Sequence, residues 1–128
     1  MRVVLALGGN AMTAPEGSAT PAAQIAAVEV AMTAAARLVA AGHELVITHG
    51  NGPQVGNLLV KNELAAHVVP PVPLDWCGAQ TQGTLGFTIL DALDDALAAT
   101  GARRPVAAIV TRTLVDRDDP AFTHPPQP

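Results

Sequence analysis

The sequence predicts an α/β fold in which helices cover a mainly parallel sheet. Short apolar runs rich in Val, Leu and Ile alternate with longer segments whose apolar residues recur every three or four positions. The short runs have the length of strands, and the longer segments have helical spacing. Strands that alternate with amphipathic helices are typical of parallel crossover units.

The first crossover unit is predicted within residues 2–47. The run from Arg2 to Leu7 predicts a buried strand, Gly8-Gly9-Asn10 follows it directly, and residues 13–21 form a loop. A helix is predicted from about Pro21 to Ala41, and Gly42 is well placed to end it. Its apolar residues form one stripe suited to a sheet. The members of the stripe are Ile25, Val28, Met32, Ala35 and Leu38.

The second strand leads into a glycine turn and another helix. The strand is predicted at 44–47, and THGNGPQVG follows at 48–56. Gly50 and Gly52 permit backbone angles closed to other residues. Pro53 suits the first helical position, where its missing N–H is not needed. This helix should end near Glu63 or His67, before the stiff Pro-rich linker.

The last predicted elements are a long helix and a third strand. The helix should run from about Asp75 to Thr100, with Gly101 as its stop. One face of this helix carries Leu85, Ile89, Leu93 and Leu97. The apolar run at 106–111 predicts a buried strand, residues 114–115 a further short strand, and residues 116–128 irregular chain.

Composition narrows the class of protein. A chain of 128 residues suits one domain, and 49% hydrophobic against 14% charged residues indicates a folded core. The net charge of −4 argues against nucleic acid as a partner. Cys77 is the only cysteine, which excludes an intrachain disulfide. No signal peptide or uninterrupted membrane-length apolar run is visible. We therefore expect a soluble, cytoplasmic protein without a membrane partner.

Two glycine turns at strand ends predict an anion site. Gly9-Asn10 follows the first strand and Gly50-Asn51 the second. In an open parallel sheet, ligands gather beyond the carboxyl ends of the strands. The helix that begins near Pro53 offers free N–H groups and the positive end of its dipole to an anion. The alternative is two ordinary tight turns, since Gly and Asn dominate turns. Because both strand ends carry such a turn, we favour an anion site over two unrelated tight turns.

Four blocks of sequence, in order along the chain, resemble carbamate kinases of the amino acid kinase superfamily. They are VLALGGNA at 4–11, THGNGPQVG at 48–56, PLD with CGAQTQG at 73–83, and DRDDPAF at 116–122. The resemblance implies a three-layer α/β/α sandwich with a mainly parallel sheet. It covers the N-terminal half or less of a family member. Residues 1–128 would thus form a truncated N-terminal part of the kinase domain, without the nucleotide-binding C-terminal part.

The resemblance implies phosphoryl transfer between ATP and carbamate, giving ADP and carbamoyl phosphate, or the reverse in arginine catabolism. By the same resemblance, the N-terminal half of a family member holds carbamate or carbamoyl phosphate. The substrate-binding residues would be Gly8, Gly9, Asn10, Gly50, Asn51 and Gly52. ATP or ADP with Mg²⁺ is expected for full-length members, with the nucleotide site largely missing here and no metal ligand in this chain. Family members pair through this half, so we expect a homodimer.

One departure from the family concerns the lysines that neutralise phosphate. A lysine is expected near the end of this segment, in an Asn/His-Pro-Thr-Lys-Pro pattern. Residues 124–128 read HPPQP, so Gln127 stands at that position. A neutral amide cannot replace an ammonium there. Lys61, the only lysine, is expected on a helix surface. None of the expected catalytic lysines is present, and the active site would be incomplete.

The sequence bears on two other functions. A dinucleotide-binding module is disfavoured because Val55 stands where G-x-G-x-x-G needs its third glycine. A truncated, catalytically inactive family member that acts only as an association or dimerisation module stays open. The sequence also leaves open why the chain ends at Pro128, whether it is active or folds alone, and the direction of flux.

Several further residues have alternative roles. His49 is expected to pack or cap beside the strand end rather than contact substrate, and Cys77 to lie in the core. Asp75 is expected to cap the long helix. The acidic residues between 116 and 119 suit a solvated turn better than a calcium loop. Residues Gln80 and Gln82 either line the pocket or bridge helices, and the sequence does not decide between these roles.

Overall fold

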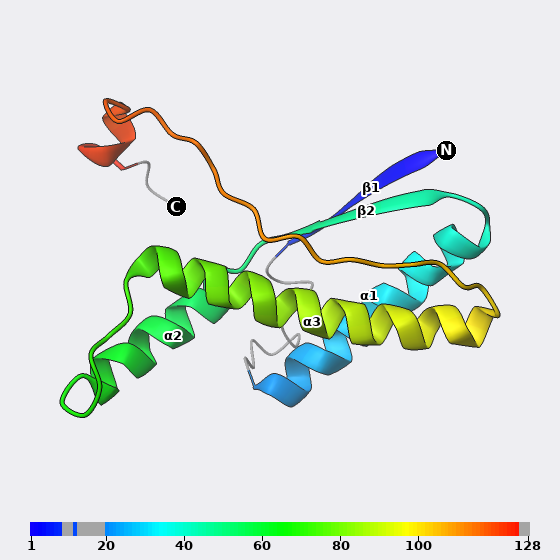
Figure 1. Ribbon diagram of the computed structural model, residues 1–128, viewed down its shortest axis with the longest axis horizontal. Helices are drawn as coiled ribbons and strands as arrows, with labels where there is room; N and C mark the ends of the chain where they lie inside the picture. The colour runs from blue at the N-terminus through cyan, green and yellow to red at the C-terminus, as the bar shows by residue number, and fades with distance from the viewer. Residues whose placement is uncertain (9–11, 13–19, 126–128) are drawn as a thin grey trace.

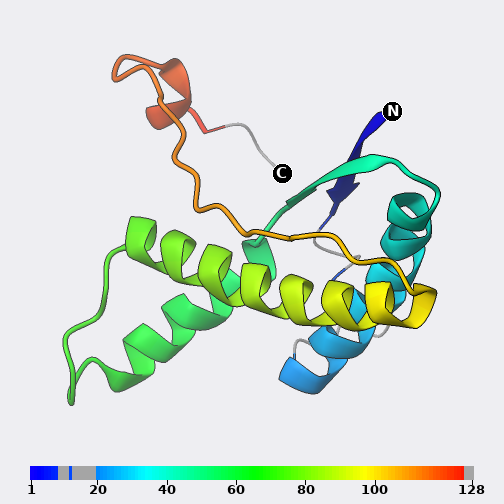
Figure 2. The same ribbon diagram turned by 45° about the vertical axis from the view of Figure 1, so that its right-hand side comes forward.

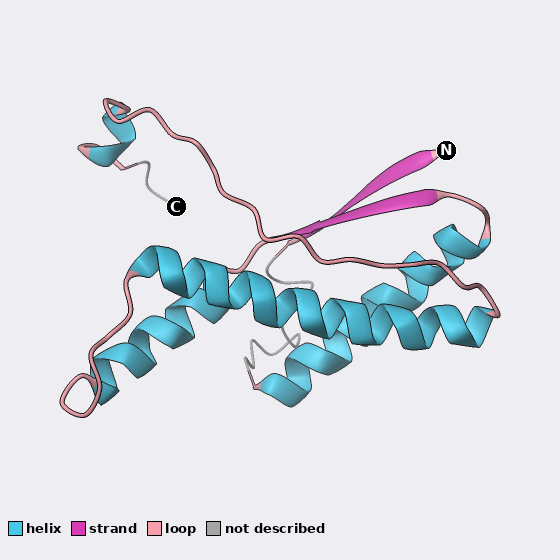
Figure 3. Cartoon of the chain, in the orientation of Figure 1, coloured by secondary structure: helices cyan, strands magenta, loops and turns pink. Residues whose placement is uncertain are grey.

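A computed structural model describes residues 1–8, 12 and 20–125. The elements, shown in Figure 1 and by type in Figure 3, follow the order predicted for the first two strands and three helices. They are β1 (Arg2–Leu7), α1 (Pro21–Ala40), β2 (Glu44–His49), α2 (Gly52–Ala65), α3 (Leu74–Thr100) and a 3-10 turn at Pro120–Phe122.

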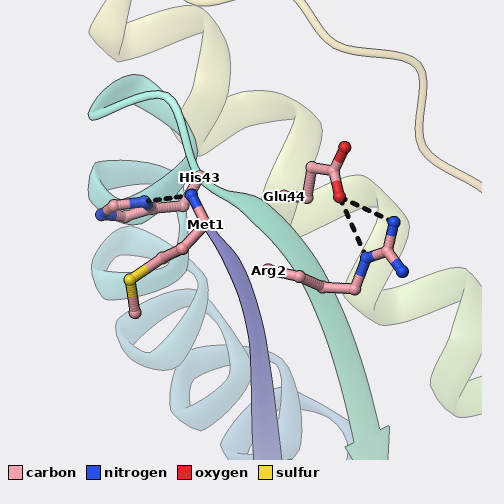
Figure 4. Close-up of polar contacts among 4 residues, drawn as sticks. All are labelled: Met1, Arg2, His43 and Glu44. Atoms are coloured by element: carbon pink, nitrogen blue, oxygen red, sulfur yellow. Dashed lines mark hydrogen bonds and ion pairs between the residues drawn. The ribbon is translucent and has the colours of Figure 1, made fainter.

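The strands β1 and β2 form a parallel pair, in register from Arg2 opposite Glu44 to Leu7 opposite His49. The helix α1 connects them, which confirms the predicted crossover unit. At the start of the strands, Arg2 and Glu44 form an ion pair of 2.9 Å (Figure 4). The N-terminal ammonium of Met1 lies 3.4 Å from Nδ1 of His43. Both partners of the ion pair are exposed, so its contribution to stability is about 1 kcal/mol or less.

The core lies between one face of the sheet and the helices α1 and α3, which lie on the same side of it (Figure 2). Leu5 and Leu7 of β1 point into this core, whereas Val4 and its partner Val46 are exposed on the other face. The buried cluster consists of Leu7, Met12, Val28, Met32, Ala35, Ala36, Leu85, Ile89, Ala92, Leu93 and Leu97. The described residues therefore form the sheet and one helical layer.

The predicted stripe of α1 is confirmed at Val28, Met32 and Ala35, but Ile25 is exposed. Thr20 caps the helix by accepting a hydrogen bond from the N–H of Ala23 at 3.3 Å. Contrary to the sequence-based expectation, α1 is long and apolar enough to cross a membrane by length and composition alone. Its buried stripe packs in the core with α3 and the sheet, and 28% of the apolar window is buried.

The helix α3 has the predicted apolar face, and Gly101 ends it with a φ of 74°. The expected N-cap role of Asp75 is wrong, because Pro73 occupies the N-cap position in an extended conformation. Asp75 lies in the first turn, where its carboxylate accepts a hydrogen bond from the N–H of Trp76 at 3.0 Å. The indole of Trp76 itself is exposed.

The predicted strands at 106–111 and 114–115 are wrong for the described part of the chain, where residues 102–115 are irregular. A strand needs a backbone partner, and a cavity of about 830 Å³ lies between β2, α3 and residues 104–111. The side chain of Gln82 on α3 holds this segment instead. Its Nε2 donates to the carbonyl of Thr111 at 3.1 Å, and its Oε1 accepts from the N–H of Thr111 at 2.7 Å.

Gly86 lets residues 102–111 approach α3, because a Cβ added there would lie 2.9 Å from the Cβ of Ala108. Alanine stabilises a helix relative to glycine by roughly 1 kcal/mol. We nevertheless expect Gly86→Ala to lower the free energy of unfolding by about 1–2 kcal/mol, because the overpacking outweighs the gain in helix propensity. Urea unfolding followed by far-UV circular dichroism measures the difference.

The control is Gly83→Ala on the same helix, where an added Cβ meets no atom within 4 Å. This variant should be more stable than the original chain by up to about 1 kcal/mol. Equal stabilisation by both substitutions would show that residues 102–111 do not pack on α3.

Candidate functional site

The two glycine turns leave the sheet at the same edge. Leu7 and His49 are partners at the last position of the parallel register, and Gly8 and Gly50 follow them directly. The N–H of Gly50 donates to the carbonyl of Leu7 at 3.2 Å, which extends the pairing by one step. This is the arrangement expected of strand ends in a parallel sheet. The predicted site residues Gly9, Asn10 and Gln127 lie outside the described residues.

The free donors of the site come from the first turn of α2. The N–H of Gly50 is used by Leu7, and Pro53 has no N–H. The first helical hydrogen bond joins the N–H of Val55 to the carbonyl of Asn51 at 2.9 Å. Asn51 is the N-cap residue, but its side chain makes no capping hydrogen bond. The N–H groups of Gly52 and Gln54 are therefore available at the positive end of the helix dipole.

The side chain of Asn51 points to α3 instead of capping α2. Its Nδ2 donates to Oγ1 of Thr81 at 2.8 Å. The Thr81 hydroxyl in turn donates to the carbonyl of Gly78 at 2.9 Å. Thr81 is only 3% exposed, so this contact is held within the packing of α2 against α3.

In the described part of the chain, nothing in the packing requires glycine at Gly8 or Gly52. Neither has a positive φ, and a Cβ added at either position would meet no described atom within 4 Å. By contrast, Gly42 and Gly101 adopt positive φ and are needed where helices end. Open space in front of Gly8 and Gly52 allows a ligand to approach the main chain closely.

Gln54 is a feature of the site that the sequence analysis missed. It is the only buried residue of α2, at 8% exposure, and neither Oε1 nor Nε2 has a hydrogen-bond partner among the residues that the structure describes. Buried polar groups in proteins are nearly always paired. The only sequence signal is a glutamine on the inner face of a short helix.

Replacing Gln54 with methionine is expected to raise the free energy of unfolding by about 1–3 kcal/mol, the penalty of an unsatisfied buried amide. Methionine has nearly the same shape and no polar group to satisfy. Urea unfolding followed by circular dichroism tests this expectation. The matched control is Gln80→Met on α3, where the side chain is exposed and the change should stay within about 0.5 kcal/mol. A destabilised Gln54→Met would mean that the amide has a protein partner.

The structure also shows the burial and contacts of the other candidate residues. His49 is half-buried beside the strand end, with Nδ1 3.0 Å from the carbonyl of Gly50. Cys77 is buried, which confirms its expected place in the core. Lys61 is exposed, as expected. Gln82 joins α3 to the irregular segment at Thr111, not to another helix.

The acidic segment forms a turn that its own carboxylates stabilise. Asp116 accepts from the N–H of Asp118 at 3.0 Å, and Asp119 accepts from the N–H of Ala121 at 2.8 Å. Across residues 1–8, 12 and 20–125, no three His, Cys, Asp or Glu side chains group closely enough to hold a metal ion. The described part of the site can therefore bind and orient a small anion through neutral donors, without a charged side chain in residues 50–56.

Comparison with known proteins gives a consistent result. The profile of the amino acid kinase family matches residues 1–117. The carbamate kinase of Trichomonas vaginalis is 46% identical over 129 residues, which is 100% of this chain and 41% of that protein. The carbamate kinase of Latilactobacillus sakei is 43% identical, over 99% of this chain and 40% of its own length.

Solved structures agree with the sequence relatives. Carbamate kinase from Giardia lamblia bound to AMP-PNP matches with a TM-score of 0.93 at 41% identity, over 99% of this chain and 45% of that one. A protein of Aeropyrum pernix matches with a TM-score of 0.92 at 38% identity. The predicted α/β class with a parallel sheet is thus confirmed. The chain spans about 40% of the length of the relatives it matches.

Proposed function

The chain belongs to the amino acid kinase family, and from this premise we propose that it forms the carbamate or carbamoyl phosphate side of a carbamate kinase-like phosphotransferase. The whole protein would exchange a phosphoryl group between ATP and carbamate, and the reverse direction makes ATP. The observation that carries the proposal is the pair of glycine turns on adjacent strands beside the uncapped start of α2.

The geometry suits the binding of a small oxyanion. The N–H groups of Gly52 and Gln54 donate to its oxygens, and the dipole of α2 favours its negative charge. Gly8 and Gly50 let the main chain approach, and Gly9 and Asn10 complete the proposed set of substrate-binding residues. The Nδ2 group of Asn51 donates one hydrogen to Oγ1 of Thr81, and its second hydrogen is available to the ligand.

Phosphoryl transfer depends mainly on positioning and on electrostatic stabilisation of the moving charge. Fixed backbone donors provide the positioning and part of the stabilisation, because they need no reorganisation during the reaction. The described residues supply no lysine at the turns, and Lys61 is exposed on α2. Neutralisation of the phosphates is therefore no part of the role proposed for these residues.

Nucleotide use is proposed for the whole protein, because a similar carbamate kinase was solved with AMP-PNP. When bound, Mg²⁺ would neutralise charge on the nucleotide phosphates. The described residues contain no set of metal ligands, so none of them is assigned to Mg²⁺.

A cytoplasmic homodimer without nucleic acid or membrane partners is a further part of the proposal. The net charge of −4 supports the exclusion of nucleic acid as a partner. Exposed apolar side chains near the α2–α3 corner support self-association. They are Leu59, Val60, Leu64, Val68, Val69, Leu74 and Trp76. The same surface favours the second candidate function, an inactive module that only associates.

Two measurements on the full chain test the proposal. The amide signals of Gly52 and Gln54 should shift saturably in a nuclear magnetic resonance titration with carbamoyl phosphate, and sulfate at equal ionic strength should shift them less. No shift at these amides would overturn the substrate-side assignment. Formation of ATP from carbamoyl phosphate and ADP above a protein-free control would reject the purely associating module.

A further inference from the structure

The first turn of α2 lacks a cap although a strong capping residue stands there. Asparagine is among the best N-cap residues, and its side-chain oxygen normally accepts from the N–H of the second or third helical residue. In α2 these residues are Pro53, which has no N–H, and Gln54. Only the N–H of Gln54 is therefore available to Asn51, and no capping hydrogen bond is made.

Two features keep Asn51 from capping the helix: its backbone, with φ −147° and ψ 14°, lies outside the extended conformation usual for an N-cap, and Thr81 holds its side chain. The hydroxyl hydrogen of Thr81 is used by the carbonyl of Gly78 at 2.9 Å, so toward Asn51 the hydroxyl can only accept. Asn51 therefore presents Nδ2 to Thr81 at 2.8 Å, and this fixes the orientation of the carboxamide. Because Thr81 is 3% exposed, water does not compete effectively for this contact.

A second, independent feature of the same turn points to a ligand. Gln54 is 8% exposed, and within residues 1–8, 12 and 20–125 both polar atoms of its side chain lack partners. Its backbone N–H is the one that Asn51 leaves uncapped. The backbone N–H and the buried carboxamide of Gln54 thus lack partners among the described residues, and open space lies in front of the main chain at Gly52 two positions before it. Such a concentration of unpaired donors is costly unless another group satisfies them.

We infer that Thr81 is a positioning residue that keeps the N-terminus of α2 open for the oxyanion. By holding the carboxamide of Asn51 against α3, it prevents Asn51 from capping the N–H of Gln54 and leaves that donor to the ligand. The inference rests on the proposed function, in which the ligand is carbamoyl phosphate. It adds a residue of α3 that controls the site without contacting the ligand.

The decisive substitution is Thr81→Val, which keeps the shape of the side chain and removes the hydroxyl. The side chain of Asn51 is then released, its backbone can relax to the extended conformation of an N-cap, and Asn51 caps α2. Hydrogen exchange of the Gln54 amide in the ligand-free chain should slow by about fivefold, the factor that a typical N-cap supplies. Affinity for carbamoyl phosphate should fall by about tenfold, because a charge-assisted hydrogen bond is lost to the cap.

Three variants make the result specific. Thr81→Ser keeps the hydroxyl and should retain the original exchange rate and affinity. Thr84→Val is the matched control, because Thr84 is exposed on the same helix and its hydroxyl donates only to the carbonyl of Gln80. It should change neither quantity. The double variant Thr81→Val/Asn51→Ala removes the new cap, so exchange at Gln54 should become fast again.

Unchanged exchange at Gln54 in Thr81→Val, or failure of Thr81→Ser to restore it, would overturn the inference. If circular dichroism shows that Thr81→Val is unfolded, Thr81→Ala undergoes the same measurements. The exchange experiment uses no ligand, so it decides the role of Thr81 separately from the proposed function. Absence of carbamoyl phosphate binding by the original chain would count against the proposed function alone.

Discussion

Replacement of Gly52 by alanine is expected to weaken carbamoyl phosphate binding by about 10- to 100-fold and to leave stability nearly unchanged. The added methyl group would stand in open space, with no atom of the described residues within 4 Å. Gly52 has no positive φ, so alanine can adopt its backbone conformation without strain. The methyl group would therefore collide with the ligand and with nothing else. Overpacking of about 1–3 kcal/mol corresponds to the expected loss of affinity.

The control for this substitution is Gly56→Ala, one turn further along α2. Gly56 is also exposed, and a Cβ added there also meets no atom within 4 Å. When unfolding is followed by circular dichroism, Gly52→Ala should match the original chain, and Gly56→Ala, inside the helix, should gain up to about 1 kcal/mol. Only Gly52→Ala should lose affinity in the titration. Original affinity in Gly52→Ala would show that the ligand does not lie against the start of α2.

Replacement of Leu85 by alanine should lower the free energy of unfolding by about 2–5 kcal/mol. Leu85 is 2% exposed and belongs to the core formed by α1, α3 and the sheet. Truncation removes buried apolar surface and leaves a cavity that the surrounding side chains fill only in part. The loss is a large fraction of the stability of a typical domain.

The matched control is Phe87→Ala, on the same helix but 66% exposed. Its effect should stay within about 0.5 kcal/mol, as for most surface substitutions. Urea unfolding followed by far-UV circular dichroism measures both variants. A loss at Phe87 as large as that at Leu85 would mean that α3 buries the opposite face.

The helices and the first two strands could be predicted because their signals are local. The apolar spacing of α3 and the left-handed Gly101 belong to the same short stretch of chain. The third strand could not be predicted reliably, because an apolar run becomes a strand only when another backbone pairs with it. At Thr111 that partner is the side chain of Gln82, which no spacing rule reveals.

The candidate site was predictable to a similar extent. That parallel strands end at one edge was enough to place Gly8 beside Gly50, and the resemblance identified the family. The roles of Thr81 and Gln54 depend on how α2 packs against α3, and on which side chains that packing buries. Neither property follows from residue type alone. Boundaries also shifted slightly, as the N-cap at Pro73 instead of Asp75 shows.

The exposed indole of Trp76 determines which changes in this protein can be followed by fluorescence. The chain has one tryptophan and no tyrosine, so its near-ultraviolet absorption and emission come almost entirely from this side chain. The indole is already 59% exposed before unfolding, and its fluorescence should change little when the core is lost. Changes in emission would instead register association or local rearrangement around the beginning of α3.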